Sequence, residues 1–282
     1  MESKKIFFGD TNKDVYLEIV DCESSEAVLS GDTGTASARP AVIICPGGGY
    51  FCVGTTEGMP VAEEFNKQGF APFILNYSVM GNAYMDIEHP EDFPPVNDLS
   101  NAIQYLFDNA DALNIISEEI SIAAFSAGAH LALRYCLNKA KMSKDSKMNL
   151  RSIILVYPFL DLRYKVDKLK VSPDRSAEAL FKLVAKRMFG NFPPTDKQYE
   201  MFSNIDLLKS LDEKAIQALP PIFIYHAKND TMVPIQSSED LIIVLKEKNV
   251  GFTAYICENG EHANPFYDPS WFTEAMRWYD SL

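Results

Sequence analysis

The stretch "AAFSAGAH" (residues 123–130) places one serine, Ser126, among residues with very small side chains. The preceding "ISIAAF" (120–125) is an apolar run typical of a buried strand, and "AGAHLALRYCLNK" (127–139) is typical of a helix. No residues remain for an ordinary loop, so Ser126 must lie in a sharp strand-to-helix turn. Such a turn strains the backbone of the serine and requires small neighbours two positions away, which here are Ala124 and Gly128.

This turn matches the nucleophile elbow, normally G-x-S-x-G, with Ala124 in place of the first glycine. The substitution departs from the motif but keeps a small side chain. An elbow would set the hydroxyl of Ser126 at a helix N-terminus, where unpaired N–H groups favour negative charge. The alternative is that Ser126 only caps a closely packed helix.

Short apolar runs alternate with longer amphipathic stretches along the chain. Strands are expected at 15–20, 41–45, 72–76, 120–125, 152–157, 221–227 and 252–257, and helices at about 58–68, 97–113, 127–140, 235–249 and 270–281. This alternation predicts an α/β fold with a mostly parallel sheet and helices on both faces. The strand at 15–20 alternates in polarity like an edge strand, with antiparallel or uncertain pairing.

We expect one domain over residues 1–282 with a cap-like insertion at about 159–215. That segment is too long for a plain crossover, carries proline pairs and one or two helices at about 175–189, and lacks apolar runs for a core of its own. It is expected to lie over the carboxyl edge of the sheet. Residues 22–40, rich in Ser, Gly, Thr and Ala, are expected to form a loop.

Composition narrows the class of protein. The net charge of −13 disfavours binding to nucleic acid or to anionic membranes. No apolar run reaches the roughly 18 residues of a membrane span, and the first residues lack the pattern of a secretory signal. The five cysteines have no paired spacing, so free thiols in the cytoplasm are expected rather than disulfides or a metal site. Assembly into a homo-oligomer stays open.

A glycine run, "CPGGGY" (45–50), follows the strand at 41–45. Its N–H groups can turn toward an oxygen without interference from side chains, and removing one donor from an oxyanion hole typically raises the barrier by about 3–4 kcal/mol. We predict that Gly47, Gly48 and Gly49, with the N–H of Ala127, form such a hole. A phosphate-binding loop is the rival, but no nucleotide-binding fingerprint is present. A merely flexible turn is the other alternative.

The predicted general base is His262, in "CENGEHANPF" after the last strand. A histidine on that loop can reach over the sheet edge to accept the proton of Ser126. His130 lies one turn into the helix after the serine and should pack beneath the site. His226 ends a buried strand and is expected to be structural, and His89 lies in a proline-rich loop.

The predicted acid partner is Asp230, in "HAKNDTMVP" after the penultimate strand. Adjacent strand ends should bring it to His262, where it would hold the imidazole tautomer and stabilise the imidazolium. Asp161, after the preceding strand, is the rival. Glu258 and Glu261 are nearer to the histidine in sequence but are expected to face solvent.

The order of these features, glycine loop, serine, aspartate and histidine, is that of α/β-hydrolases. From residue 40 to 282 the sequence resembles that superfamily, and within it the carboxylesterases related to hormone-sensitive-lipase-like and acetyl-xylan-esterase-like proteins. The motifs "PGGGY", "FSAGAHLA", "HAKNDTMVP" and "GEH" carry the resemblance. Two departures are Ala124 at the elbow and "CPGGG" where many lipases have "HGGG".

The resemblance implies a serine esterase without metal or cofactor that cleaves small-molecule esters, with short acyl groups favoured and acetylated sugars as one candidate. Aromatic residues near strand ends are the predicted substrate-binding residues: Tyr50, Phe51, Tyr77 and Phe159. A serine amidase or peptidase is the alternative enzyme, although 282 residues leave no room for the large screening domain of prolyl-peptidase-like enzymes. A non-catalytic binder on the same fold is the third interpretation.

Overall fold

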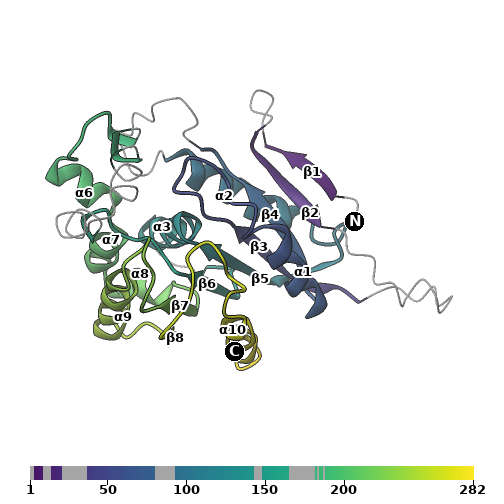
Figure 1. Ribbon diagram of the computed structural model, residues 1–282. Helices are drawn as coiled ribbons and strands as arrows, with labels where there is room; N and C mark the ends of the chain where they lie inside the picture. Colours follow the sequence, from purple (N-terminus) through teal and green to yellow (C-terminus); the bar gives the residue numbers. More distant parts are fainter. Residues whose placement is uncertain are drawn as a thin grey trace.

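The structure is a computed structural model that describes residues 3–8, 14–20, 37–79, 93–142, 148–164, 182, 184–186 and 188–282. Its centre is an eight-stranded sheet with the order β1-β2-β4-β3-β5-β6-β7-β8 (Figure 1). The strands are β1 (Ser3–Phe7), β2 (Tyr16–Val20), β3 (Arg39–Cys45), β4 (Ala71–Asn76), β5 (Ile115–Phe125), β6 (Ser152–Val156), β7 (Ile222–Ala227) and β8 (Phe252–Cys257). Strands β4, β3 and β5 to β8 are parallel, whereas β1 and β2 are antiparallel to their neighbours.

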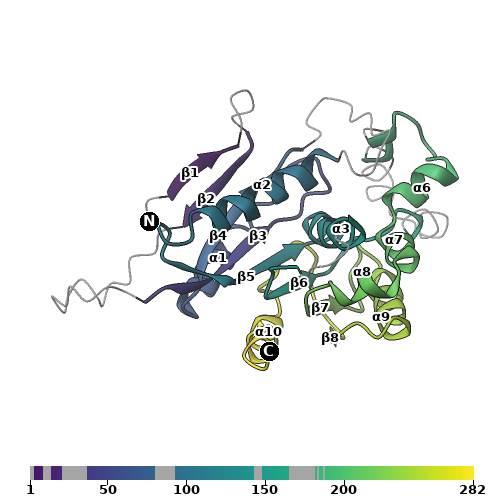
Figure 2. The same ribbon diagram turned by 180° about the vertical axis from the view of Figure 1, so that it is seen from behind.

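Helices cover both faces of this sheet (Figures 1 and 2). They are α1 (Met59–Lys67), α2 (Pro94–Asp108), α3 (Ala127–Met142), α6 (Asp196–Phe202), α7 (Asn204–Ser210), α8 (Glu213–Gln217), α9 (Gln236–Glu247) and α10 (Ser270–Tyr279). Among the described residues, none of the helices has both the length and the apolar character needed to cross a bilayer.

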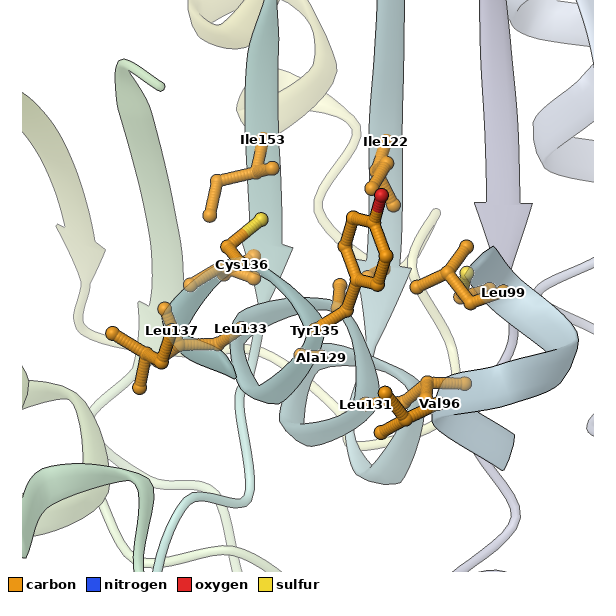
Figure 3. Close-up of a cluster of buried hydrophobic side chains, with 14 of the residues drawn as sticks. Val96, Leu99, Ile122, Ala129, Leu131, Leu133, Tyr135, Cys136, Leu137 and Ile153 are labelled. Atoms are coloured by element: carbon orange, nitrogen blue, oxygen red, sulfur yellow. The ribbon is translucent and has the colours of Figure 1, made fainter. Parts of the chain in front are cut away.

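Two hydrophobic clusters result from the alternation of side chains along the strands. On one face, Ile43 and Ile122 belong to a cluster with residues of α2, α3, α7, α8 and α9; Figure 3 shows the part around α3, where Leu99 and Ile153 pack against it. On the other face, Ile44 belongs to a cluster with residues of α1 and α10. The central strands are therefore apolar on both faces, as expected for a parallel sheet covered by helices.

The expected α/β architecture is confirmed, and all seven expected strands are present. The sequence reading missed β1, which has only five residues and two lysines and is defined by its antiparallel pairing with β2, where Lys5 lies opposite Glu18. The predicted start of β5, residue 120, is later than the observed start at Ile115, because the polar residues 117–119 interrupt the apolar pattern. Helix α2 begins at Pro94, earlier than expected, since proline is tolerated in a first helical turn.

Part of the expected cap-like insertion, and most of the expected loop at 22–40, lie outside the described residues. Of 159–215, residues 165–181, 183 and 187 are not described, which includes most of the helical stretch expected at about 175–189. In the described remainder, α7 and α8 pack against α3. Val184 does face the cavity at that edge.

The turn between β5 and α3 places Ser126 at φ 50°, a conformation that non-glycine residues seldom adopt. The Ser126 N–H donates to the carbonyl of Val156 at 3.0 Å, which ties the turn to the end of β6. Gly128 packs so closely on the end of β3 that an added Cβ would lie 2.1 Å from the carbonyl oxygen of Cys45 and 2.5 Å from that of Pro46. The helix can begin at the serine only because residue 128 has no side chain.

We predict that Gly128→Ala destabilises the fold by about 3 kcal/mol or more, because the methyl group meets backbone atoms that cannot rotate away. Helix propensity alone would favour alanine by about 1 kcal/mol, so the expected sign is opposite to that of propensity. Gly251→Ala is the matched control, because no atom lies within 4 Å of its added Cβ. Urea unfolding midpoints test this, and equal midpoints for the two variants would contradict it.

Candidate active site

Three side chains that are far apart in the chain form one line of hydrogen bonds at the carboxyl edge of the sheet. Ser126 Oγ lies 2.9 Å from Nε2 of His262, and Nδ1 of His262 lies 2.7 Å from Oδ2 of Asp230. Ser126 comes from the end of β5, Asp230 from the loop after β7, and His262 from the loop after β8. The structure thus brings together the three residues that the sequence analysis selected.

The carboxylate of Asp230 is held from several sides. Its Oδ1 accepts the backbone N–H groups of Met232 and Val233, both at 2.8 Å. Its Oδ2 faces His262 and, at 3.4 Å, Nε2 of His226. Burial alone would raise the pKa of Asp230, but the hydrogen bonds from His226, His262 and Val233 outweigh it, so the pKa lies well below its ordinary value. Asp230 is therefore a fixed negative charge behind the imidazole.

The other histidines have different partners. His130 is buried in α3, where Nδ1 faces the hydroxyl of Tyr50 at 2.7 Å and Nε2 faces the carbonyl of Phe202 at 2.8 Å. Burial and a nearby arginine lower the pKa of His130 to about 3, so the ring is neutral. His226 is fully buried; its Nδ1 faces a serine hydroxyl, and its Nε2 faces the carbonyl of Val233 as well as the carboxylate of Asp230. His89 lies outside the described residues.

The rival acids are engaged elsewhere. Asp161 is buried and pairs with the guanidinium of Arg163 at 2.5 Å. Glu258 pairs with Lys228 at the surface, and Glu261 is exposed. Of these acids and Asp230, it is Asp230 that lies within hydrogen-bonding distance of His262.

The glycine loop differs in one respect from the expectation. Gly48 and Gly49 have φ values of 117° and 60°, and both line the cavity beside Ser126. Within the described parts of the chain, their N–H groups and that of Ala127 donate none of the hydrogen bonds that we observe. The N–H of Gly47, however, donates to Oε2 of Glu57 at 2.6 Å. Gly47 was therefore wrongly expected to be an oxyanion donor, because its donor is already occupied.

The expected substrate contacts of two tyrosines are wrong. Tyr50 and Tyr77 are each 1% exposed and point into the core. The hydroxyl of Tyr50 reaches His130, whereas that of Tyr77 donates to the carbonyls of Pro46 at 2.7 Å and Gly47 at 3.3 Å. Both rings therefore support the glycine loop from behind. Proximity to strand ends in the sequence did not reveal on which side of the loop each ring would lie.

A cavity of about 310 Å³ opens at the Ser126–His262 pair. It is lined by Gly48, Gly49, Phe51, Cys52, Glu57, Ser126, Phe159, Val184, Met232, Val233, His262 and Ala263. Phe159 and Phe51 thus do line it, as the sequence suggested. Within the described ranges, no three His, Cys, Asp or Glu side chains form a group that could hold a metal ion.

Sequence reasoning missed Glu57 and Tyr157. Glu57 is 1% exposed, lines the cavity, and accepts the hydroxyl of Tyr157 on Oε1 at 2.7 Å. Burial raises the pKa of Glu57, although hydrogen bonds from Tyr157 and Gly47 counteract part of this effect. The only sequence signal was an acidic residue in the loop "GTTEGMP" after the glycine run, which resembles any solvated loop acid.

Two related proteins match parts of the sequence. Endo-1,4-β-xylanase B of Butyrivibrio fibrisolvens is 28% identical over 231 residues, which cover 79% of this chain and 32% of the xylanase. An acetylxylan esterase of Xylanibacter ruminicola is 34% identical over 93 residues, which cover 33% of this chain and 18% of that protein. The chain thus matches a third or less of the length of each of these relatives.

Solved structures share the fold over the whole chain. An acetyl ester-xyloside bifunctional hydrolase from Caldicellulosiruptor lactoaceticus superposes with a TM-score of 0.69 at 23% identity, covering 97% of this chain and 90% of the other. MGS-M1, an α/β-hydrolase enzyme from a Medee basin deep-sea metagenome library, has a TM-score of 0.62 at 24% identity, covering 100% and 97%.

The family model BD-FAE matches residues 30–245, which is well over half of the chain. This range includes the glycine loop, the elbow serine and Asp230, and it ends before the loop that carries His262. Because the family model matches most of the chain, and because the sheet and the solved structures agree with it, the chain belongs to the BD-FAE family and has the α/β-hydrolase fold.

Proposed function

We propose that this protein is a serine hydrolase that cleaves carboxylic esters through an acyl-enzyme on Ser126. The observation that carries the proposal is the unbroken hydrogen-bond line from Ser126 through His262 to Asp230 at the wall of a cavity. A serine hydroxyl is a weak nucleophile until an adjacent base takes its proton, and the base needs a third group to orient it. These three side chains supply those roles.

The proton movements follow from the geometry. Nδ1–H of His262 donates to Asp230, which leaves Nε2 free to accept the proton of Ser126 as Oγ attacks the ester carbonyl. The resulting imidazolium then gives that proton to the leaving alcohol. Water enters, His262 takes one of its protons, and the hydroxide attacks the acyl-enzyme. Collapse of the second tetrahedral intermediate releases the acid and returns the proton to Ser126.

The oxyanion of both tetrahedral intermediates would be bound by the N–H groups of Gly48, Gly49 and Ala127. Ala127 follows the nucleophile and opens α3, so the partial positive charge of that helix end also favours the oxyanion. Such donors are effective in catalysis when the fold orients them before substrate binds.

The acyl side of the substrate is proposed to be short. Phe159, Val184, Met232 and Val233 give the cavity apolar walls close to Ser126. Acetylated sugars are the substrate class that we favour, because one relative is an acetylxylan esterase and one structural neighbour is an acetyl ester-xyloside bifunctional hydrolase.

Ser126→Ala should reduce turnover of p-nitrophenyl acetate by at least about 10³-fold, because the nucleophile is lost while the fold is kept. A fluorophosphonate probe should label the wild type and not this variant. Ser281→Ala, at an exposed serine, serves as the control and should keep wild-type turnover and labelling. Retained Ser126→Ala turnover would remove the nucleophile assignment, and an absence of labelling between about pH 6 and 9 would favour a non-catalytic binder.

Asp230→Asn should lower kcat by about 10³–10⁴-fold, since an amide can neither hold the productive tautomer nor balance the imidazolium. It should also change how stability depends on pH. Because the folded pKa of Asp230 is depressed, its contribution is present above the ordinary aspartate pKa of about 4 and is lost as the pH falls through the lower folded value. Wild type should therefore lose more stability than Asp230→Asn between about pH 6 and 3.

Urea midpoints across that pH range measure the Asp230 contribution. Asp280→Asn, at an exposed carboxylate near the end of the chain, is the control and should follow the wild-type curve. Parallel curves for wild type and Asp230→Asn would show that the native interactions of this carboxylate do not favour its charged form.

Phe159→Val should shift acyl preference toward longer chains, because it removes part of an apolar wall of the cavity. We expect the ratio of kcat/KM for p-nitrophenyl octanoate to that for the acetate to rise by at least about tenfold. Phe7→Val, at a half-exposed ring on the edge strand β1, is the matched control. An unchanged ratio in Phe159→Val would exclude Phe159 from the acyl site.

A further inference from the structure

Glu57 is a buried carboxylate with two distinct partners. It lies in the loop between β3 and α1 and is 1% exposed. Oε2 accepts the backbone N–H of Gly47 at 2.6 Å, and Oε1 accepts the hydroxyl of Tyr157 at 2.7 Å. Placing a charge in the protein interior costs several kcal/mol unless it is well compensated. The position of Glu57 therefore calls for a role beyond filling space.

The first partner fixes the glycine loop. An added Cβ on Gly47 would lie 2.8 Å from both Oε2 of Glu57 and Cβ of Ser126, so the loop backbone passes closely between the two. The Gly47 carbonyl in turn accepts the N–H of Gly54 at 3.0 Å. Glu57 thus holds the residue directly before Gly48, whose N–H is one of the proposed oxyanion donors.

The second partner reaches the base. The ring of Tyr157 lies with its centroid 4.6 Å from that of His262, at an interplanar angle of 48°. Tyr157 follows β6 with a positive φ of 38°, and its hydroxyl is directed at Glu57. Glu57 therefore sets the orientation of a ring that packs directly on the imidazole.

Charge adds to this geometry. Glu57 interacts electrostatically with His262, and among the described residues the phenols of Tyr157 and Tyr77 also interact with it. Asp230 also interacts electrostatically with Tyr157. Glu57 is thus a second carboxylate, besides Asp230, in the surroundings of the imidazole.

We propose that Glu57 is a positioning residue that holds the oxyanion loop through Gly47 and the general base through Tyr157, so that one buried carboxylate aligns both halves of the catalytic site. The proposal rests on the proposed ester hydrolysis. Glu57 acts through its neighbours and forms no bond with the substrate in this scheme. Its charge also favours the imidazolium that forms as Ser126 attacks.

The experiment compares kcat, KM and the pH profile of kcat/KM for p-nitrophenyl acetate in wild type, Glu57→Gln, Tyr157→Phe and the double variant. Glutamine keeps an acceptor for Gly47 but removes the charge. Phenylalanine keeps the ring on His262 but removes the hydroxyl. Tyr164→Phe is the matched control, since Tyr164 also donates to a carboxylate, that of Asp240, away from the cavity.

We expect Glu57→Gln to lower kcat at least about tenfold while KM stays within about threefold. The acid limb of its kcat/KM profile should move to lower pH, because removing a negative charge makes protonation of the base less favourable. Tyr157→Phe should lower kcat at least about threefold, and the double variant should lose no more than Glu57→Gln alone, because both changes remove the same donation from the Tyr157 hydroxyl to a carboxylate. Tyr164→Phe should match wild type.

Glu57→Gln with wild-type kcat and an unmoved acid limb would overturn the proposal, as would Tyr157→Phe with wild-type kcat. If Glu57→Gln does not fold, Tyr157→Phe decides alone. A merely structural role would lower the thermal midpoint without moving the acid limb, and that outcome also overturns the proposal. Failure of the proposed function itself is distinguishable, because wild type would then show no turnover that depends on Ser126.

Discussion

The close approach of Gly128 to the end of β3 is the constraint on which the site depends. With no side chain at 128, α3 can start directly at the sheet and Ser126 can adopt a φ of 50°. Backbone hydrogen bonds then join the serine to β6, through the carbonyl of Val156, and to the next loop, through the N–H of Phe159. The strain at Ser126 is thus balanced by the packing of Gly128 on β3 and by these two hydrogen bonds, which keep the hydroxyl at the cavity wall.

The glycine loop is shaped from behind by buried polar side chains from separate elements. Tyr77 follows β4, and its hydroxyl donates to the carbonyls of Pro46 and Gly47. Tyr50 is held by a neutral His130 of α3, and Glu57 holds the N–H of Gly47. A loop rich in glycine loses much conformational entropy when it is ordered, and these supports offset that loss. The backbone of the glycine loop is therefore ordered by contacts within the protein itself.

The sequence predicted the parts that follow from local pattern and strand order. Ser126 could be predicted because the elbow motif consists of consecutive residues. Asp230 and His262 could be predicted because adjacent parallel strands bring the loops that follow them together. Contacts between residues that are distant in the sequence have no such local pattern. Glu57 meets Tyr157 across 100 positions of sequence, and nothing in "GTTEGMP" distinguishes a buried acid from a solvated one. Three glycines in a row likewise do not reveal which N–H is already occupied.

A crystal structure of the protein after reaction with a p-nitrophenyl alkylphosphonate would test the central claim most directly, because the phosphonyl group mimics the tetrahedral intermediate of ester hydrolysis. We expect a covalent bond from Ser126 Oγ to phosphorus and one phosphonyl oxygen within about 3 Å of the N–H groups of Gly48, Gly49 and Ala127. The alkyl group should lie against Phe159. Phosphorus on another residue, or a phosphonyl oxygen turned away from all three N–H groups, would contradict it.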